Sequence, residues 1–209
     1  FASTRAESAT SGCLARCDWV CEPLLLELLG RVVNISAELE AWLTHDRHLL
    51  LKHWAEHAAL PDDWRQFAHH LAMQCWINEY VWPAPAQFAS LQPQLLECMR
   101  AAQSERAADA FVIWSLCAPP TQQASSALTF ERCPAHLRPF WDTSVAGPLR
   151  EREIAAGMVE ANLTNEVSTA VRAQYEQSPY PRWVELGQQS EEAAPSMLAR
   201  TFSTYRRAA

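Results

Sequence analysis

Glycine and lysine are both scarce in this chain, and each scarcity excludes a class of function. Five glycines occur among 209 residues, at positions 12, 30, 147, 157 and 187, and no two are closer than ten residues. Loops that cradle a phosphate or a dinucleotide need glycines within a few residues of each other, so the chain carries no such loop. Lys52 is the sole lysine and the net charge is −7, which makes nucleic acid and anionic membranes unsuitable partners.

Long apolar runs are also missing. The longest, Leu24–Leu29, is interrupted by Glu27, whereas a membrane span needs ~20 residues. The first residues, FASTRAESATSG, lack the apolar centre of a signal peptide. Seven cysteines are an odd number and too few for a disulfide framework, so we interpret them as reduced thiols of a cytoplasmic protein.

Hydrophobic residues, by contrast, make up 49% of the chain, with nine tryptophans and 13 prolines. Apolar residues recur at spacings of three and four between the prolines, which is typical of amphipathic helices. The predicted helices span residues 13–29, 36–57, 61–82, 86–103, 105–117, 148–159 and 166–176. Ser36 is the expected N-cap of the second helix, and Gly30 is expected to end the first. Residues 121–147 are predicted to be loop with short helical turns.

No convincing alternating strand occurs, so we predict an all-α fold, either a helical bundle or a short solenoid of paired antiparallel helices. A 34-residue period gives no clean self-match. The expected organisation is a flexible end at 1–12, a helical domain at 13–177, and a proline-rich extended segment and linker at 178–209.

Two amides on the helix 61–82 are candidate site residues. Gln74 and Asn78 continue the apolar stripe formed by Trp64, Phe67 and Leu71. A buried amide needs hydrogen-bond partners, so this polar cluster, with the neighbouring Glu79, forms an internal network or lines a groove.

Cysteines and histidines recur at helical spacing, but without a recognisable metal motif. Cys13, Cys17 and Cys21 would spread over roughly 12 Å of one helix, so we interpret them as core residues rather than as zinc or iron–sulfur ligands. His53 and His57 are four apart, yet the residue after His53 is not the glutamate of a zinc-protease motif. We predict no metal site and no catalytic residue in the chain.

The stretch QYEQSPYPRW, Gln174–Trp183, ends the last predicted helix. Each proline disfavours helical geometry at the residue before it, so Tyr180 and Trp183 lie on a stiff extended segment. Such side chains lose little entropy on docking. The segment is therefore either a latch on the last helix or a contact surface for a further domain or a substrate.

This stretch and two others, LEAWLTHDRHLLL (39–51) and FAHHLAMQCWINEYVW (67–82), resemble a known family. They are similar to blocks of bacterial class I S-adenosylmethionine-dependent methyltransferases with a helical, often tetratricopeptide-bearing, N-terminal region. The resemblance covers about residues 20 to 183. The QYE…PYPRW block is its most specific part, although Ser178 stands where the family usually has asparagine.

The resemblance implies a non-catalytic, tetratricopeptide-like region that docks on a methyltransferase domain of the same polypeptide and helps select or present the substrate, possibly a protein. Tyr175, Tyr180, Arg182 and Trp183 would form the docking or substrate-contact corner. S-adenosylmethionine would bind to the catalytic domain, and this chain would be inactive alone. The alternative is a stand-alone helical scaffold that binds a peptide or a partner protein.

Overall fold

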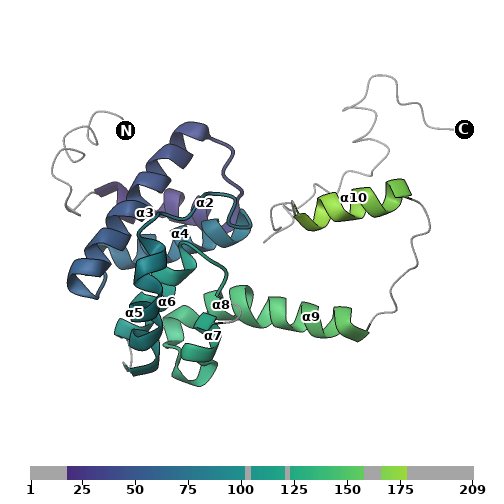
Figure 1. The fold of residues 1–209 in the computed structure, drawn as a ribbon. Coiled ribbons are helices and arrows are strands. Elements are labelled where there is room, and N and C mark those ends of the chain that lie inside the picture. Colours follow the sequence, from purple (N-terminus) through teal and green to yellow (C-terminus); the bar gives the residue numbers. More distant parts are fainter. Residues whose placement is uncertain (1–17, 102–104, 121–122, 158–165, 178–209) are drawn as a thin grey trace, which may run out of the picture.

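The computed structural model describes residues 18–101, 105–120, 123–157 and 166–177, and within these ranges the chain is all-α with no strand (Figure 1). The predicted fold class is confirmed. The helices are α2 (Pro23–Arg31), α3 (Ala37–His57), α4 (Asp62–Ile77), α5 (Phe88–Ala101), α6 (Glu105–Ser115), α7 (Gln123–Ala127), α8 (Arg138–Trp141), α9 (Gly147–Gly157) and α10 (Glu166–Gln177). Short 3-10 turns η2 (Asp18–Cys21), η3 (Phe130–Arg132) and η4 (Ala135–Leu137) and a π-helical turn η5 (Asp142–Ala146) lie between them.

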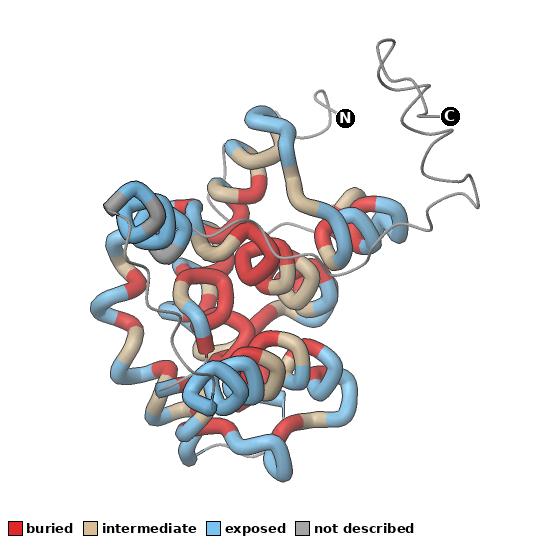
Figure 2. Tube along the Cα trace, turned by 90° about the vertical axis from the view of Figure 1, so that its right-hand side faces the viewer, coloured by how far each residue is buried: buried red, intermediate tan, exposed pale blue. Residues whose placement is uncertain are grey.

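Helix α4 lies at the centre of the packed body. It packs against α2 on one side and α6 on another, while α5 packs against both α6 and α7. Phe67, Leu71 and Ile77 of α4 are fully buried. Figure 2 shows the buried residues gathered along the inner sides of these helices. A groove beside α4 is therefore lined by residues of more than one helix.

Helix α3 buries a stripe that contains two charged residues. Ser36 caps the helix as predicted, since its hydroxyl accepts a hydrogen bond from Leu39 N at 3.2 Å. Periodicity alone predicts an apolar stripe of Leu39, Trp42, Leu43, Leu49, Leu50 and Trp54 on this helix, and the structure confirms only three of these residues as buried. The buried residues are Leu43, Asp46, Arg47, Leu50, Leu51 and Trp54. Their spacing of three and four residues is regular, but the charges of Asp46 and Arg47 conceal it in the sequence.

The first predicted helix, 13–29, is not continuous within the described residues. A 3-10 turn ends at Cys21, and α2 starts at Pro23. The proline ring has no N–H to continue a helical ladder, so it suits a first helical position rather than an interior one. Gly30 also does not end the helix, which continues to Arg31. A Cβ at Gly30 would lie 3.0 Å from His70 Nδ1, so this glycine permits close packing of α2 on α4.

The helix predicted to reach Trp82 ends at Ile77. Glu79 and Tyr80 have φ angles of 52° and 56°, the left-handed region that glycine usually occupies at a helix end. The amide of Tyr80 donates to Cys75 O at 2.9 Å and that of Glu79 donates to Trp76 O at 3.1 Å. The chain therefore turns sharply after α4, and residues 78–87 cross to α5 without regular helix.

Residues 123–137 form short helical turns, as predicted for the segment 121–147. Residues 138–157 instead form one continuous helical run, of which only the part from 148 was predicted as helix. Phe140 on α8 packs edge-on against His69 of α4 and Phe111 of α6, with ring centroids 5.4 and 6.2 Å apart. This contact fixes α8 to the body. The run then continues through η5 into α9, whose residues from Leu149 onward are exposed and which extends away from the body in Figure 1.

Helix α10 confirms the last predicted helix to within one residue. The expected flexible end, 1–12, and the extended segment, 178–209, lie outside the described residues. No helix in the described part of the chain combines the length and apolarity needed to cross a bilayer.

Candidate functional site

Two adjoining hollows border α4 and share His69 and His70. One has a volume of about 310 Å³ and the other about 530 Å³. The smaller is lined by Glu27, Gly30, Arg31, His69, His70, Met73, Pro139 and Phe140. The larger is lined by Asp62, Arg65, Gln66, His69, His70, Glu105, Ala108, Asp109, Val112, His136 and Leu137. We refer to the two together as the histidine cleft.

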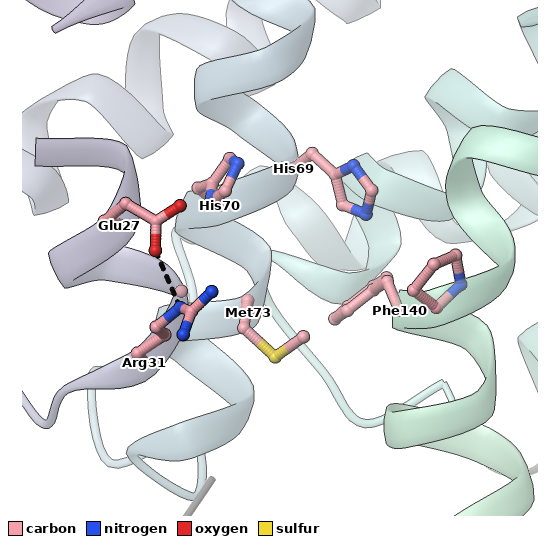
Figure 3. Close-up of a pocket in the computed structure, with 8 residues that line it drawn as sticks. Glu27, Arg31, His69, His70, Met73 and Phe140 are labelled. Atoms are coloured by element: carbon pink, nitrogen blue, oxygen red, sulfur yellow. Dashed lines mark ion pairs between the residues drawn. The ribbon is translucent and has the colours of Figure 1, made fainter. Parts of the chain in front are cut away.

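The smaller hollow has a charged entrance and an apolar floor. Glu27 and Arg31 form an ion pair at its edge, with Oε2 and Nε 2.7 Å apart (Figure 3). Opposite them, Met73 and Phe140 supply apolar surface from α4 and α8. Ligand pockets combine apolar lining with a few polar groups in this way, so this hollow suits a partly apolar group.

The larger hollow is built around the Arg65–Asp109 pair. Arg65 Nε donates to Asp109 Oδ1 at 2.8 Å, and Arg65 Nη2 donates to Asp109 Oδ2 at 3.1 Å. Asp109 also accepts from the Leu60 amide at 3.0 Å. His136 lies 3.7 Å from the carboxylate of Glu105. The hollow therefore presents carboxylates and imidazoles around one fixed cation.

Burial sets the charge states in the cleft. It lowers the pKa of His69 to about 4, with smaller contributions from His70 and His136. Burial also lowers the pKa of His70, against the opposing effect of Glu27. The hydrogen bond to Asp109 raises the pKa of Arg65 further above its usual value. Both half-buried imidazoles are therefore predominantly uncharged at neutral pH. His70 already bonds to the Leu26 backbone, and a neutral imidazole has one donor and one acceptor nitrogen.

The cleft thus has the chemistry of a binding site for a mixed polar and apolar group. Within the described residues, no group of three or more histidine, cysteine, aspartate or glutamate side chains is arranged to hold a metal ion. His53 and His57 do meet, with ring centroids 4.2 Å apart. Cys21 is exposed on η2, and its thiol lies 3.8 Å from Asp63 O. Cys13 and Cys17 lie outside the described residues.

Gln74 and Asn78 form an internal network, the first of the two expected alternatives. Both side chains are buried. With the Gln74 amide oriented to satisfy both its atoms, its nitrogen donates to Leu29 O at 3.2 Å and Val32 O at 2.9 Å. Its oxygen accepts from Asn34 N and Asn78 Nδ2, each at 3.2 Å. These bonds tie α4 to the end of α2 and the segment that leads to α3.

Glu79 is half-buried and takes part in a different feature, the left-handed turn after α4. Of the residues expected to form the docking corner, Tyr175 lies on α10 and is 52% exposed. Tyr180, Arg182 and Trp183 lie outside the described residues, so their role stays a prediction.

Several residues of interest were missed in the sequence. Arg65, Asp109 and His136 lie far apart in the chain, and no local pattern pairs them. Arg47 is 1% exposed and Asp46 is equally buried. Their spacing from Leu43 and Leu50 was a usable signal, because it places both residues on the buried stripe of α3.

Comparison with known proteins gives no guide to the cleft: no family model, no curated protein and no solved structure matches this chain.

Proposed function

We propose that the chain is a non-catalytic helical region of an S-adenosylmethionine-dependent methyltransferase. It docks on the catalytic domain through its C-terminal part and helps select or present the methyl acceptor. The proposal combines the resemblance of the QYE…PYPRW block with one structural observation, the exposed apolar side chains of α10.

Those side chains are Val167, Val171 and Tyr175, which are 69, 43 and 52% exposed. They follow one another at four-residue spacing, so they lie on neighbouring positions of one side of the helix. Helix α10 leads directly into the SPYPRW stretch. A helix face and a stiff aromatic segment that are continuous in sequence would form one docking surface, with the catalytic domain as its occupant.

In this arrangement the catalytic domain holds S-adenosylmethionine and carries out methyl transfer. The contribution of this chain is positioning. The histidine cleft, which is part of the packed body rather than of α10, would be the place where an acceptor group is held.

The first test is to read the coding sequence after Ala209 and to express the longer protein. We expect a strand followed by a glycine-rich loop, and binding of S-adenosylmethionine by the longer protein. Hydrogen exchange of residues 166–183 should slow at least tenfold relative to the 209-residue chain. A stop codon directly after Ala209, or unchanged exchange in a longer protein that binds the cofactor, would overturn the docking proposal.

Tyr175→Ser provides a sharper test in the longer protein. We expect it to restore fast exchange in 166–183, because it removes an apolar contact from the docking surface. Ile35→Ser is the matched control, since Ile35 is 96% exposed and lies on the segment between α2 and α3. Equal effects of the two substitutions would contradict a specific role for α10.

The histidine cleft also favours a second candidate, a stand-alone scaffold that holds a peptide or a partner protein. Affinity capture with the isolated chain separates the two. A stable partner unrelated to any methyltransferase, captured by the wild type and lost with a substitution in the cleft such as Met73→Asp, would favour the scaffold.

A further inference from the structure

The Arg47 guanidinium is buried without a counter-charge. Arg47 is 1% exposed, and the ion pairs of the described residues do not include it. Its Nε and Nη1 atoms have no hydrogen-bond partner. Its Nη2 atom lies 3.5 Å from Pro83 O, which is the long limit for a hydrogen bond, and its other polar neighbour is the uncharged thiol of Cys117. A buried cation in this state is costly unless an anion pairs with it.

A thin cover separates Arg47 from solvent. The segment 78–87 crosses over α3, with Pro83 O near Arg47 and Gln87 Nε2 donating to His48 O at 3.4 Å. The ring of Trp82 faces the guanidinium, with the Arg47 carbon Cζ 6.0 Å from its centroid. Val81 and Pro83 are exposed on the outer side of the segment. Residues that lack regular hydrogen bonding can move aside at lower cost than a helix.

The cover also starts from a strained turn. Glu79 and Tyr80 are consecutive non-glycine residues in the left-handed region. Non-glycine residues in this region are strained, and strain of this kind concentrates at ligand clamps and switch segments. The contact at Pro83 is long and the turn at the start of the segment is strained, so residues 81–87 are held less firmly than α3 and α4, while Asn78, Glu79 and Tyr80 stay bonded to α4.

The floor beneath Arg47 is neutral. Burial raises the pKa of Cys75 to about 12 and that of Cys117 to about 11, and the positive charge of Arg47 opposes both increases. The two thiols are therefore protonated at neutral pH and supply no negative charge. Arg47 and Trp82 come from two of the sequence blocks, 39–51 and 67–82, so these blocks meet at one place in the fold.

We propose that Arg47 is the anchor of a buried oxyanion-binding site beneath the segment 78–87, which takes a small ligand with a carboxylate or a phosphate group. The guanidinium offers the unused Nε and Nη1 donors to the oxyanion, and such charge-assisted bonds are the strong ones in proteins. The ring of Trp82 would cover the apolar part of the ligand. This site is separate from α10 and does not depend on the docking function.

The test observes the Arg47 Nε–Hε group directly by NMR of ¹⁵N-labelled protein. Inorganic phosphate and acetate are titrated separately at pH 7 against chloride of matched ionic strength. We expect a saturable shift of the Arg47 signal with at least one of the two anions. The anion that shifts the signal shows whether the natural ligand carries a phosphate or a carboxylate group. Arg65 is the internal control, because its Nε is already bonded to Asp109 at 2.8 Å.

A shift of Arg47 no larger than that of Arg65, or one that chloride reproduces, would overturn the proposal and leave Arg47 as a structural residue bonded to water. Thermal unfolding gives an independent measure. The anion that shifts Arg47 should raise the Tm of the wild type by several degrees and that of Arg47→Met by less than half as much. Equal increases in both proteins would show that the anion binds elsewhere.

Discussion

Arg65 on α4 and Asp109 on α6 meet in a two-point contact, with Nε–Oδ1 and Nη2–Oδ2 distances of 2.8 and 3.1 Å. Asp109 is 2% exposed. Removing its charge leaves the guanidinium without its main partner and the Leu60 amide without an ionised acceptor. We expect Asp109→Ala to reduce the free energy of unfolding by about 3 kcal/mol. Asp62→Ala is the control, since the Asp62 side chain is 91% exposed, and should cost under about 1 kcal/mol. Urea unfolding measures both, and equal losses would refute the role of burial.

The Gln74 amide network should be sensitive to a substitution of similar volume. Gln74→Leu leaves the carbonyls of Leu29 and Val32 and the amide of Asn34 without their partner. Each unsatisfied buried group costs about 1–3 kcal/mol, so we expect a total loss of about 3 kcal/mol in urea unfolding. Gln66→Leu on the exposed side of the same helix should be nearly neutral. Asn78→Leu should also destabilise the chain, and a neutral result would place Asn78 outside the network.

His69 should make the fold sensitive to mild acid. Burial lowers its pKa from the ordinary 6.5 of histidine to about 4 in the folded chain. Between these values the unfolded state binds the proton and the folded state does not, so stability falls as the pH decreases. From pH 7 to pH 5 the wild type should lose about 1–2 kcal/mol more than His69→Gln. His48→Gln, at an exposed position, is the control and should keep the wild-type pH dependence.

The thiols should differ in reactivity according to burial. Cys21 is exposed, whereas Cys75 and Cys117 are buried with pKa values raised to about 12 and about 11. Iodoacetamide reacts with thiolates, so native protein at pH 8 should be alkylated at Cys21 and spared at the two buried positions. Mass spectrometry of peptides locates the label. Labelling of Cys75 in native protein as fast as in 8 M urea would contradict the packing of α4.

Trp183 should contribute little to the stability of the 209-residue chain if it belongs to a docking surface. We expect Trp183→Ala to change the free energy of unfolding by under about 0.5 kcal/mol. Trp54→Ala is the contrasting case, because Trp54 is 2% exposed, and should cost about 3–5 kcal/mol. A loss above ~2 kcal/mol for Trp183→Ala would mark it as a core residue of this chain.

The positions of most helices could be predicted from periodicity and proline. Ser36 as an N-cap and the end of α10 are local features, and both are confirmed. The turn at Glu79 and Tyr80 could not be predicted, because neither residue favours the left-handed region on its own. Backbone bonds from Tyr80 N to Cys75 O and from Glu79 N to Trp76 O close the turn, and no glycine or asparagine at these two positions signals it in the sequence.

The histidine cleft could not be predicted from the sequence either, because its residues are distant from one another in the chain. His69, Asp109 and His136 come from three elements that meet only after α4, α6 and η4 have packed. The polar network of Gln74 and Asn78 could be predicted, because these two amides continue an apolar stripe in the sequence. Arg47 also lies within an apolar stripe, that of α3. Charged residues are rarely buried, however, so its residue type predicts an exposed position.

The π-helical turn Asp142–Ala146 has a consequence for α9. Gly147 N–H donates to Asp142 O, a bond across five residues that accommodates one residue more than an α-helical turn. Each residue rotates a helix by about 100°, so this extra residue sets the rotation of α9 about its axis and with it the direction of the exposed Ile154 side chain. The rotation of α9 about its own axis thus depends on the number of residues in this turn rather than on the identity of their side chains. Deleting one residue between Asp142 and Ala146 would turn the side chains of α9 by about 100° about the helix axis, whereas a conservative substitution keeps the residue count and therefore this rotation.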